Sequence, residues 1–176
     1  MNAELIYQAA NQLITNYKFR DFNELAEQLD IKLYYRKDFD KLLGLYAIIE
    51  NQACIFLNAR LDFYYLQMVL AHEIGHDRLH KDFAKNSVLG EHSLFDSKNR
   101  MEYEANAFAS HLLIETPILL DYLSSGMTIN NVANELNIDQ NYVLIKLLEL
   151  KKLGANIDLN RIPQMPNSSF LKNISV

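Results

Sequence analysis

Apolar residues in the first thirty positions recur at steps of three and four, which is the spacing of one helical face. Two helices are predicted. Their apolar positions are Leu5, Ile6, Ala9, Leu13 and Ile14 in the first and Phe22, Leu25, Ala26 and Leu29 in the second. Asp21 and Asn23 are candidate caps of the second helix, because short polar side chains accept hydrogen bonds from the free N–H groups of a first turn.

The pattern changes at residue 31 to one typical of strands. Residues 31–35 are rich in β-branched and aromatic side chains, which favour extended backbone. Residues 44–57 contain two apolar runs that flank Glu50-Asn51, and this arrangement predicts a hairpin. We therefore expect a small antiparallel sheet after the first two helices.

From residue 62 onward the pattern predicts helices almost to the end of the chain. A long helix is expected at 62–80 and a second at 100–115, which Pro117 ends. Residues 81–98 show little periodicity and predict a long loop. Three shorter helices follow, at residues 118–123, 129–136 and 140–153.

Together these elements predict an α+β protein that is mostly helical. We expect residues 1–123 to form one domain with the sheet and both long helices. Residues 124–154 are expected to form a helical subdomain that resembles a helix-turn-helix. Residues 155–176 contain Pro163, Pro166 and a polar run, so they predict a weakly structured tail.

Composition and charge exclude several classes of protein. The 176 residues suit one domain, or one domain with a small subdomain, and an apolar content of 49% is enough for a core. The single cysteine, Cys54, excludes an internal disulfide and a thiolate zinc site. A net charge of −5 argues against a protein whose main role is to neutralise phosphates. Without a secretory signal or a long apolar run, we expect a cytoplasmic protein with no membrane span.

His72, Glu73 and His76 form an HExxH sequence on the first long helix. Two histidines four positions apart lie one turn apart on the same helical face, so both rings can reach one small cation. Glu73 lies about 100° away around the axis and is placed instead to act on a water as general base and later as proton donor. Apolar residues directly precede the motif. A buried unpaired charge is costly, which favours a metal site over ordinary helix residues.

A catalytic zinc site needs a third protein ligand, and the second long helix offers two candidates. Glu102 shares a helical face with Asn106, whose side chain is placed to hydrogen-bond a ligand imidazole and fix its tautomer. The small residues Ala105 and Ala109 would let the two long helices approach closely. Glu104 is the alternative metal ligand, and both glutamates could also belong to a solvated charged face. We favour Glu102 as the ligand.

These residues belong to an ordered set of motifs that resembles the ImmA/IrrE family over residues 20–153. The motifs are His72-Glu73-Ile74-Gly75-His76 with His80, Gly44-Leu45-Tyr46-Ala47, Ile55-Phe56-Leu57-Asn58, Glu102-Tyr103-Glu104-Ala105-Asn106-Ala107-Phe108-Ala109 and Leu112-Leu113. In one respect the chain departs from the family, which closes this helix with Leu-Leu-x-Pro. Here the proline is delayed to Pro117.

The resemblance implies a zincin-like fold and a cytoplasmic, gluzincin-like zinc metallopeptidase of phages, mobile elements or bacterial stress regulation. Its expected substrate is a cognate helix-turn-helix repressor, which it inactivates by limited cleavage. His72 and His76 match the histidine ligands of the family, Glu73 matches its catalytic glutamate, and Glu102 matches its glutamate ligand. Zinc is the expected metal, although two imidazoles and a carboxylate also suit other divalent ions such as Mn²⁺.

Hydrolysis of an amide also needs a donor for the developing oxyanion. Tyr46 and Tyr103 are candidates, and the lone histidines His92 and His111 are further ones. His80 lies two turns beyond the first motif histidine, about 12 Å along the axis, which is too far for one tetrahedral shell. We expect it to be structural or to contact the oxyanion or substrate, and the sequence does not choose among these residues.

Residues 124–153 leave alternative functions open, because two helices joined by a short turn also resemble a DNA-binding helix-turn-helix. The acidic and basic residues in this segment balance, so the basic surface of a DNA reader is missing and direct binding of nucleic acid is not expected. Packing against the catalytic domain or contact with a protein partner is favoured. The remaining alternative is a non-catalytic, metal-binding module that sequesters a repressor partner.

Overall fold

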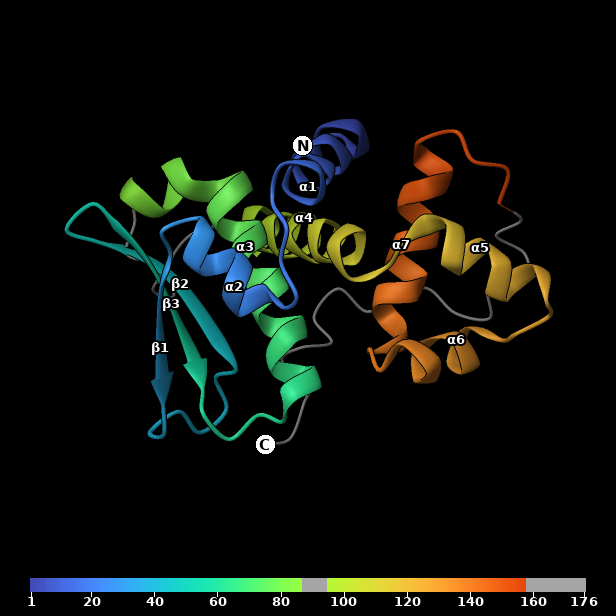
Figure 1. The fold of residues 1–176 in the computed structure, drawn as a ribbon. Coiled ribbons are helices and arrows are strands. Elements are labelled where there is room, and N and C mark those ends of the chain that lie inside the picture. Colours follow the sequence, from blue (N-terminus) through green and yellow to red (C-terminus); the bar gives the residue numbers. More distant parts are fainter. Residues whose placement is uncertain (87–94, 158–176) are drawn as a thin grey trace.

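The computed structural model describes residues 1–86 and 95–157, with seven helices and three strands in these ranges. In chain order they are α1 (Ala3–Asn16), α2 (Phe22–Gln28), β1 (Lys32–Arg36), β2 (Gly44–Ile49), β3 (Gln52–Asn58), α3 (Phe63–Asn86), α4 (Phe95–Leu113), α5 (Thr116–Ser124), α6 (Ile129–Leu136) and α7 (Gln140–Lys152). The expected α+β class is confirmed. Figure 1 shows the sheet and the α5–α7 group at opposite ends of the molecule, with α1, α3 and α4 between them.

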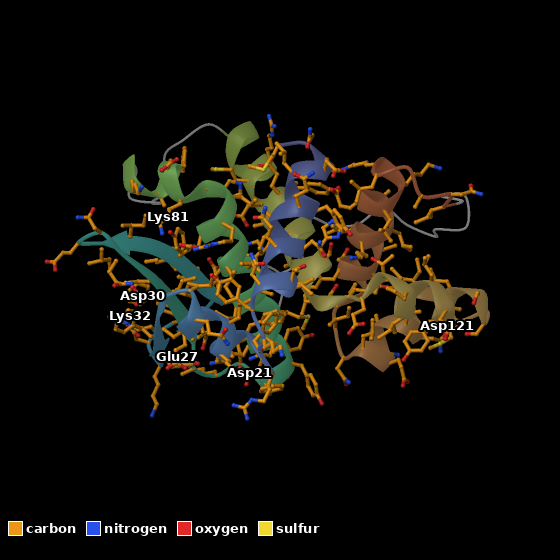
Figure 2. All side chains as sticks on the ribbon, turned by 45° about the horizontal axis from the view of Figure 1, so that its top comes forward. Asp21, Glu27, Asp30, Lys32, Lys81 and Asp121 are labelled. Carbon is orange, nitrogen blue, oxygen red and sulfur yellow. The ribbon has the colours of Figure 1, made fainter. Side chains whose placement is uncertain are left out.

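Short polar residues cap several of the helices, in agreement with elementary capping rules. Asp21 accepts a hydrogen bond from the backbone N–H of Glu24 at the start of α2, and lies at the surface in Figure 2. Asp62 does the same for α3 through the N–H of Tyr65. Asn137 ends α6 in the left-handed conformation, with φ of 53°, and so separates α6 from α7.

The sheet is built around the predicted hairpin. Strands β2 and β3 pair antiparallel, from Gly44 opposite Leu57 to Ile49 opposite Gln52. Glu50 and Asn51 connect them with φ of 50° and 66°, the left-handed pair that a two-residue hairpin turn needs.

One strand pairing differs from the expected antiparallel sheet. The strand order is β1-β3-β2, and β1 runs parallel to β3, so the sheet is mixed. Residues 37–43 carry the chain past the end of β3, which later fills the place between β1 and β2. This crossing depends on tertiary contacts and not on the residue pattern of β1 itself.

The two long helices extend further than the apolar pattern indicates. Helix α3 continues to residue 86 and α4 begins at residue 95, so the expected loop is wrong for 81–86 and 95–98, and 87–94 lie outside the described residues. Lys81, on the outside of α3 (Figure 2), pairs with Asp77 one turn earlier at 3.6 Å, and Ala84 is buried. Ion pairs between neighbouring turns and one small buried residue therefore accompany the extension of α3 beyond the end of its apolar face.

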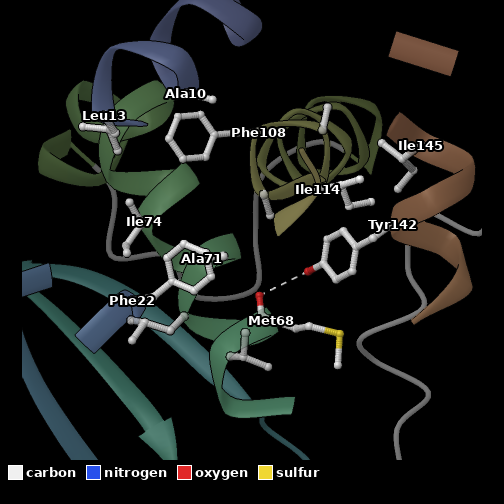
Figure 3. Close-up of a cluster of buried hydrophobic side chains, with 14 of the residues drawn as sticks. Ala10, Leu13, Phe22, Met68, Ala71, Ile74, Phe108, Ile114, Tyr142 and Ile145 are labelled. Carbon is white, nitrogen blue, oxygen red and sulfur yellow. Dashed lines mark hydrogen bonds between the residues drawn. The ribbon is translucent and has the colours of Figure 1, made fainter. Parts of the chain in front are cut away.

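The core is centred on the crossing of α3 and α4. Ile74 and Phe108 are fully buried there, and Leu13 of α1 covers them (Figure 3). At the other end of the core, the buried Tyr142 of α7 donates a hydrogen bond to the carbonyl of Met68 in α3, at 3.2 Å. The core therefore joins α7 directly to the helix that carries the HExxH sequence.

Gly75 allows α3 and α4 to pack closely where they cross. A Cβ atom on Gly75 would lie 3.1 Å from both the Cα and the carbonyl oxygen of Ala105. Ala105 and Ala109 are fully buried, in agreement with the expectation that small residues let these helices approach. A larger residue at position 75 would push α4 away from α3.

Helix α7 is buried along most of its length, and this argues against α7 as the recognition helix of a DNA-binding helix-turn-helix. Its buried positions are Tyr142, Val143, Leu144, Ile145, Lys146, Leu147, Glu149 and Leu150. A recognition helix must expose one face to enter a DNA groove, whereas α7 packs between α4 and α6. This placement favours packing over DNA reading. Of the expected weak tail, residues 158–176 lie outside the described residues.

No helix within residues 1–86 and 95–157 combines the length and the apolar character needed to cross a bilayer.

A buried lysine lies in the interface between α4 and α7. The ammonium of Lys146 is 3.0 Å from Nδ1 of His111, and both side chains are buried. Burial lowers the pKa of Lys146 to about 8. Burial and the neighbouring lysine charge lower the pKa of His111 to about 3. Helix α4 thus meets α7 across a buried lysine that loses its proton more readily than an exposed one.

We expect Lys146 to make the unfolding free energy depend on pH. Its pKa is near 10.5 when unfolded and about 8 when folded, so the unfolded chain binds more protons between these values and stability rises with pH. From pH 8 to 10 this contribution amounts to about 2 kcal/mol. Denaturant unfolding at several pH values should show this rise for the native chain but not for Lys146→Met. The exposed Lys85→Met is the control, and equal slopes in the native chain and Lys146→Met would contradict the expectation.

Candidate metal centre

The two histidines of the HExxH sequence face each other on α3. Their Nε2 atoms are 3.1 Å apart, and their ring centroids are 4.8 Å apart with nearly perpendicular planes. His72 is buried, and the His76 side chain keeps 12% of its surface exposed. One helical turn between the two residues therefore brings both ring nitrogens to a single point, as their spacing predicts.

Glu102 of α4 completes the group. Its Oε2 lies 3.6 Å from Nε2 of His72, and its Oε1 lies 3.8 Å from Nε2 of His76. Among the residues that the structure describes, these three form the group of histidine and acidic side chains spaced to hold a metal ion. The structure thus brings together the three residues favoured as ligands from the sequence.

The spacing of these atoms fits a tetrahedral metal ion. Two ligand atoms that lie about 2.0–2.1 Å from zinc at the tetrahedral angle are about 3.3–3.4 Å apart. The three distances of 3.1, 3.6 and 3.8 Å lie on both sides of this value. The Glu102 side chain keeps 21% exposure, so one side of the group borders solvent. His72, His76 and Glu102 are therefore compatible with a metal ion that has a position left for water.

Asn106 orients one of the rings, as expected from its place one turn after Glu102. Its Oδ1 lies 2.8 Å from Nδ1 of His72. When Nδ1–H donates to this carbonyl oxygen, the lone pair of Nε2 remains directed at the metal position. Asn106 is itself almost fully buried, so the contact is shielded from solvent.

Glu104, the alternative ligand, lies in a different cluster. Its Oε2 is 3.0 Å from Nε2 of His80, and its Oε1 accepts from Nε of Arg100 at 2.9 Å and from the amino group of Met1. Burial alone would raise the pKa of Glu104, but these three hydrogen bonds outweigh it and hold the pKa at about 2. The contacts of Glu104 therefore favour Glu102 as the metal ligand.

Glu73 is buried beside the histidine pair and does not belong to the three-residue group. Burial and the nearby charge of Glu102 raise its pKa to about 7, while His72 and the backbone N–H of Tyr46 act in the opposite direction. A carboxyl group that titrates near neutrality can both accept and return a proton. This is the property that a general base needs.

Gly44, at the start of β2, provides the space that Glu73 occupies. A Cβ atom at this position would lie 2.6 Å from Oε1 of Glu73 and 2.6 Å from Cγ1 of Val69. Sequence reasoning assigned no role to Gly44, although a glycine within a strand often marks the close approach of another group. The edge strand therefore sets the position of the buried carboxylate.

The two tyrosines proposed as oxyanion donors are engaged elsewhere. The hydroxyl of Tyr46 donates to Oδ1 of the buried Asp77 at 2.9 Å, and its pKa is raised by burial and by Asp77. The hydroxyl of Tyr103 donates to Glu149 at 2.7 Å and accepts from Lys152 at 2.9 Å, on the side of α4 that faces α7. These contacts do not support an oxyanion role for either hydroxyl.

The other histidines are placed as follows. His80 lies between His76 and Glu104, with its Nδ1 3.1 Å from Nδ1 of His76. His111 lies in the interface with α7, against Lys146. His92 lies outside the described residues. The contact between His80 and His76 was missed from the sequence, because only the distance of two turns from His72, which excludes His80 as a ligand, was considered.

Comparison with known proteins gives two matches. The sequence model of the family Peptidase_M78, described as the IrrE N-terminal-like domain, matches residues 26–148. The "Uncharacterized immunity region protein 2" of Bacillus phage phi105 is 30% identical over 129 residues, which is 73% of this chain and 80% of the phage protein. The family match covers the sheet, the histidine pair and Glu102.

We expect the chain to bind one Zn²⁺, and Glu102→Gln to weaken binding by more than about 100-fold, because loss of a ligand exceeds the 10- to 100-fold effect of outer partners. Glu104→Gln is the matched control and should change affinity by less than about tenfold. Competition with a chromogenic chelator measures both constants. A larger loss for Glu104→Gln than for Glu102→Gln would reverse the assignment of the ligand.

Gly44→Ala should displace Glu73 without removing a metal ligand. The added methyl group meets Glu73 and Val69, and overpacking of this kind costs about 1–3 kcal/mol. Chemical unfolding should show this loss of stability, while Zn²⁺ titration should show the stoichiometry of the native chain. Ala47→Gly is a control on the same strand. Unchanged stability of Gly44→Ala would mean that β2 does not confine Glu73.

Proposed function

The chain belongs to the Peptidase_M78 family of IrrE N-terminal-like domains, and we propose that it is a zinc-dependent, site-selective endopeptidase. Membership in this family implies a hydrolase of the peptidase type. The proposal is supported most directly by one arrangement, in which a His-His-Glu group lies beside a buried carboxyl group with a pKa of about 7. Structural zinc sites close the shell with four protein ligands, whereas catalytic sites have three and leave one position for water.

In the proposed reaction, His72, His76 and Glu102 hold the zinc ion, with Mn²⁺ as another ion that this donor set suits. When bound, the metal supplies Lewis-acid chemistry that polarises the scissile carbonyl and makes water more acidic. Glu73 accepts the proton of the attacking water and returns it to the nitrogen of the leaving amine. The backbone N–H of Tyr46 and the space at Gly44 keep the Glu73 carboxylate in position for both transfers.

We infer that the substrate is a protein, and specifically a helix-turn-helix repressor that the enzyme inactivates by limited cleavage in the cytoplasm. The similar phage protein is described as an immunity region protein, and this description supports a role in the control of a repressor. The buried position of α7 leaves the α5–α7 group without an exposed recognition helix, which favours a role in packing or in holding a protein partner.

Glu73→Gln should bind Zn²⁺ as the native chain does but lose cleavage of a helix-turn-helix repressor that the native chain cleaves. Removal of a general base lowers the rate by about 10²–10⁴-fold. Gel electrophoresis of the incubated pair measures fragment formation, and the exposed Glu50→Gln serves as control. Cleavage at the native rate by Glu73→Gln would remove Glu73 from the mechanism. A stoichiometric complex without fragments from the native chain would favour sequestration instead.

A further inference from the structure

His80 forms hydrogen bonds at both ring nitrogens, and both partners matter to the metal centre. Its Nδ1 lies 3.1 Å from Nδ1 of His76, and its Nε2 lies 3.0 Å from Oε2 of Glu104. The ring is buried, as is the Glu104 side chain. A continuous row of side chains therefore runs from a metal-ligand ring to a carboxylate on α4.

The position of each hydrogen along this row can be assigned by starting at the Glu104 carboxylate and moving toward His76. An ionised carboxylate only accepts hydrogen bonds, so Nε2 of His80 must carry a hydrogen. In a neutral ring with its hydrogen on Nε2, Nδ1 is the acceptor. The hydrogen between the two rings must consequently lie on Nδ1 of His76. The Nε2 lone pair of His76 is then directed at the position that it shares with Nε2 of His72, 3.1 Å away, where a metal would bind.

The two metal-binding histidines are therefore supported in different ways. His72 reaches an acceptor on α4 directly, through Asn106 at 2.8 Å. His76 reaches an acceptor on α4 only through the ring of His80. Arg100 fixes the far end, because its Nε donates to the other oxygen of Glu104 at 2.9 Å.

We propose that His80 and Glu104 are positioning residues, which form a relay that holds His76 in the tautomer that binds metal. The relay rests on the proposed metal site and gives His80 a role other than contact with the substrate. It acts on the metal affinity and not on the chemical step. Glu104 then supports the same metal centre as Glu102 without being a metal ligand.

The first test measures Zn²⁺ affinity of the full chain by chelator competition. Loss of an outer hydrogen-bond partner typically weakens metal binding 10- to 100-fold, and this loss is expected for His80→Phe and Glu104→Ala. His80→Gln and Glu104→Gln should recover most of the affinity, because each amide can supply an acceptor oxygen. Tyr103→Phe is the matched control on α4. It removes a hydrogen bond to Glu149 outside the relay and should bind as the native chain does.

The second test is independent of metal and of proteolysis. Nitrogen-15 NMR of the metal-free chain at about pH 8, where unperturbed histidine is neutral, reports which ring nitrogen of His76 carries the hydrogen. Protonation at Nδ1 is expected, with a mixture of tautomers in His80→Phe and Glu104→Ala. Protonation of His76 at Nε2 in the native chain would overturn the relay. Native Zn²⁺ affinity in folded His80→Phe and Glu104→Ala would overturn it too. Absence of cleavage with this pattern intact would contradict only the proposed function.

Discussion

The close crossing of α3 and α4 is the constraint on which the rest of the structure depends. Gly75 lies inside the HExxH sequence and faces Ala105, so the absence of one side chain allows α4 to approach the histidine pair. At this separation Glu102 lies 3.6 Å and Asn106 2.8 Å from ring nitrogens of His72. The motif glycine thus has a structural role that directly serves the metal centre.

The interior around this crossing contains several charged or titratable groups, and the fold accommodates each in a specific way. Glu104 has charged partners that keep it ionised, whereas Glu73 is held where its proton affinity is raised. Asp77 receives the hydroxyl of Tyr46, which connects β2 to the same helix. Burying such groups is costly unless they are paired, so their retention here is best explained by function.

Local pattern was sufficient to place the helices, apart from the end of α3 and the start of α4, and to identify the histidine pair, because both depend on spacing within one element. The choice of Glu102 over Glu104 also followed from its position relative to Asn106. Long-range features were not predictable in this way. The parallel pairing of β1 depends on how residues 37–43 cross the sheet. Tyr46 was one of several candidate oxyanion donors, because its actual partner Asp77 lies 31 positions away and local spacing does not reveal it.

We propose that two rings of α3 and one carboxylate of α4 bind a metal and leave one position open. A crystal structure of the Zn²⁺-loaded chain with anomalous diffraction at the zinc edge would locate the ion. One strong peak is expected about 2.0–2.2 Å from Nε2 of His72, Nε2 of His76 and a carboxylate oxygen of Glu102, with solvent at the fourth position. A peak bound elsewhere, or a fourth protein ligand that closes the shell, would contradict it.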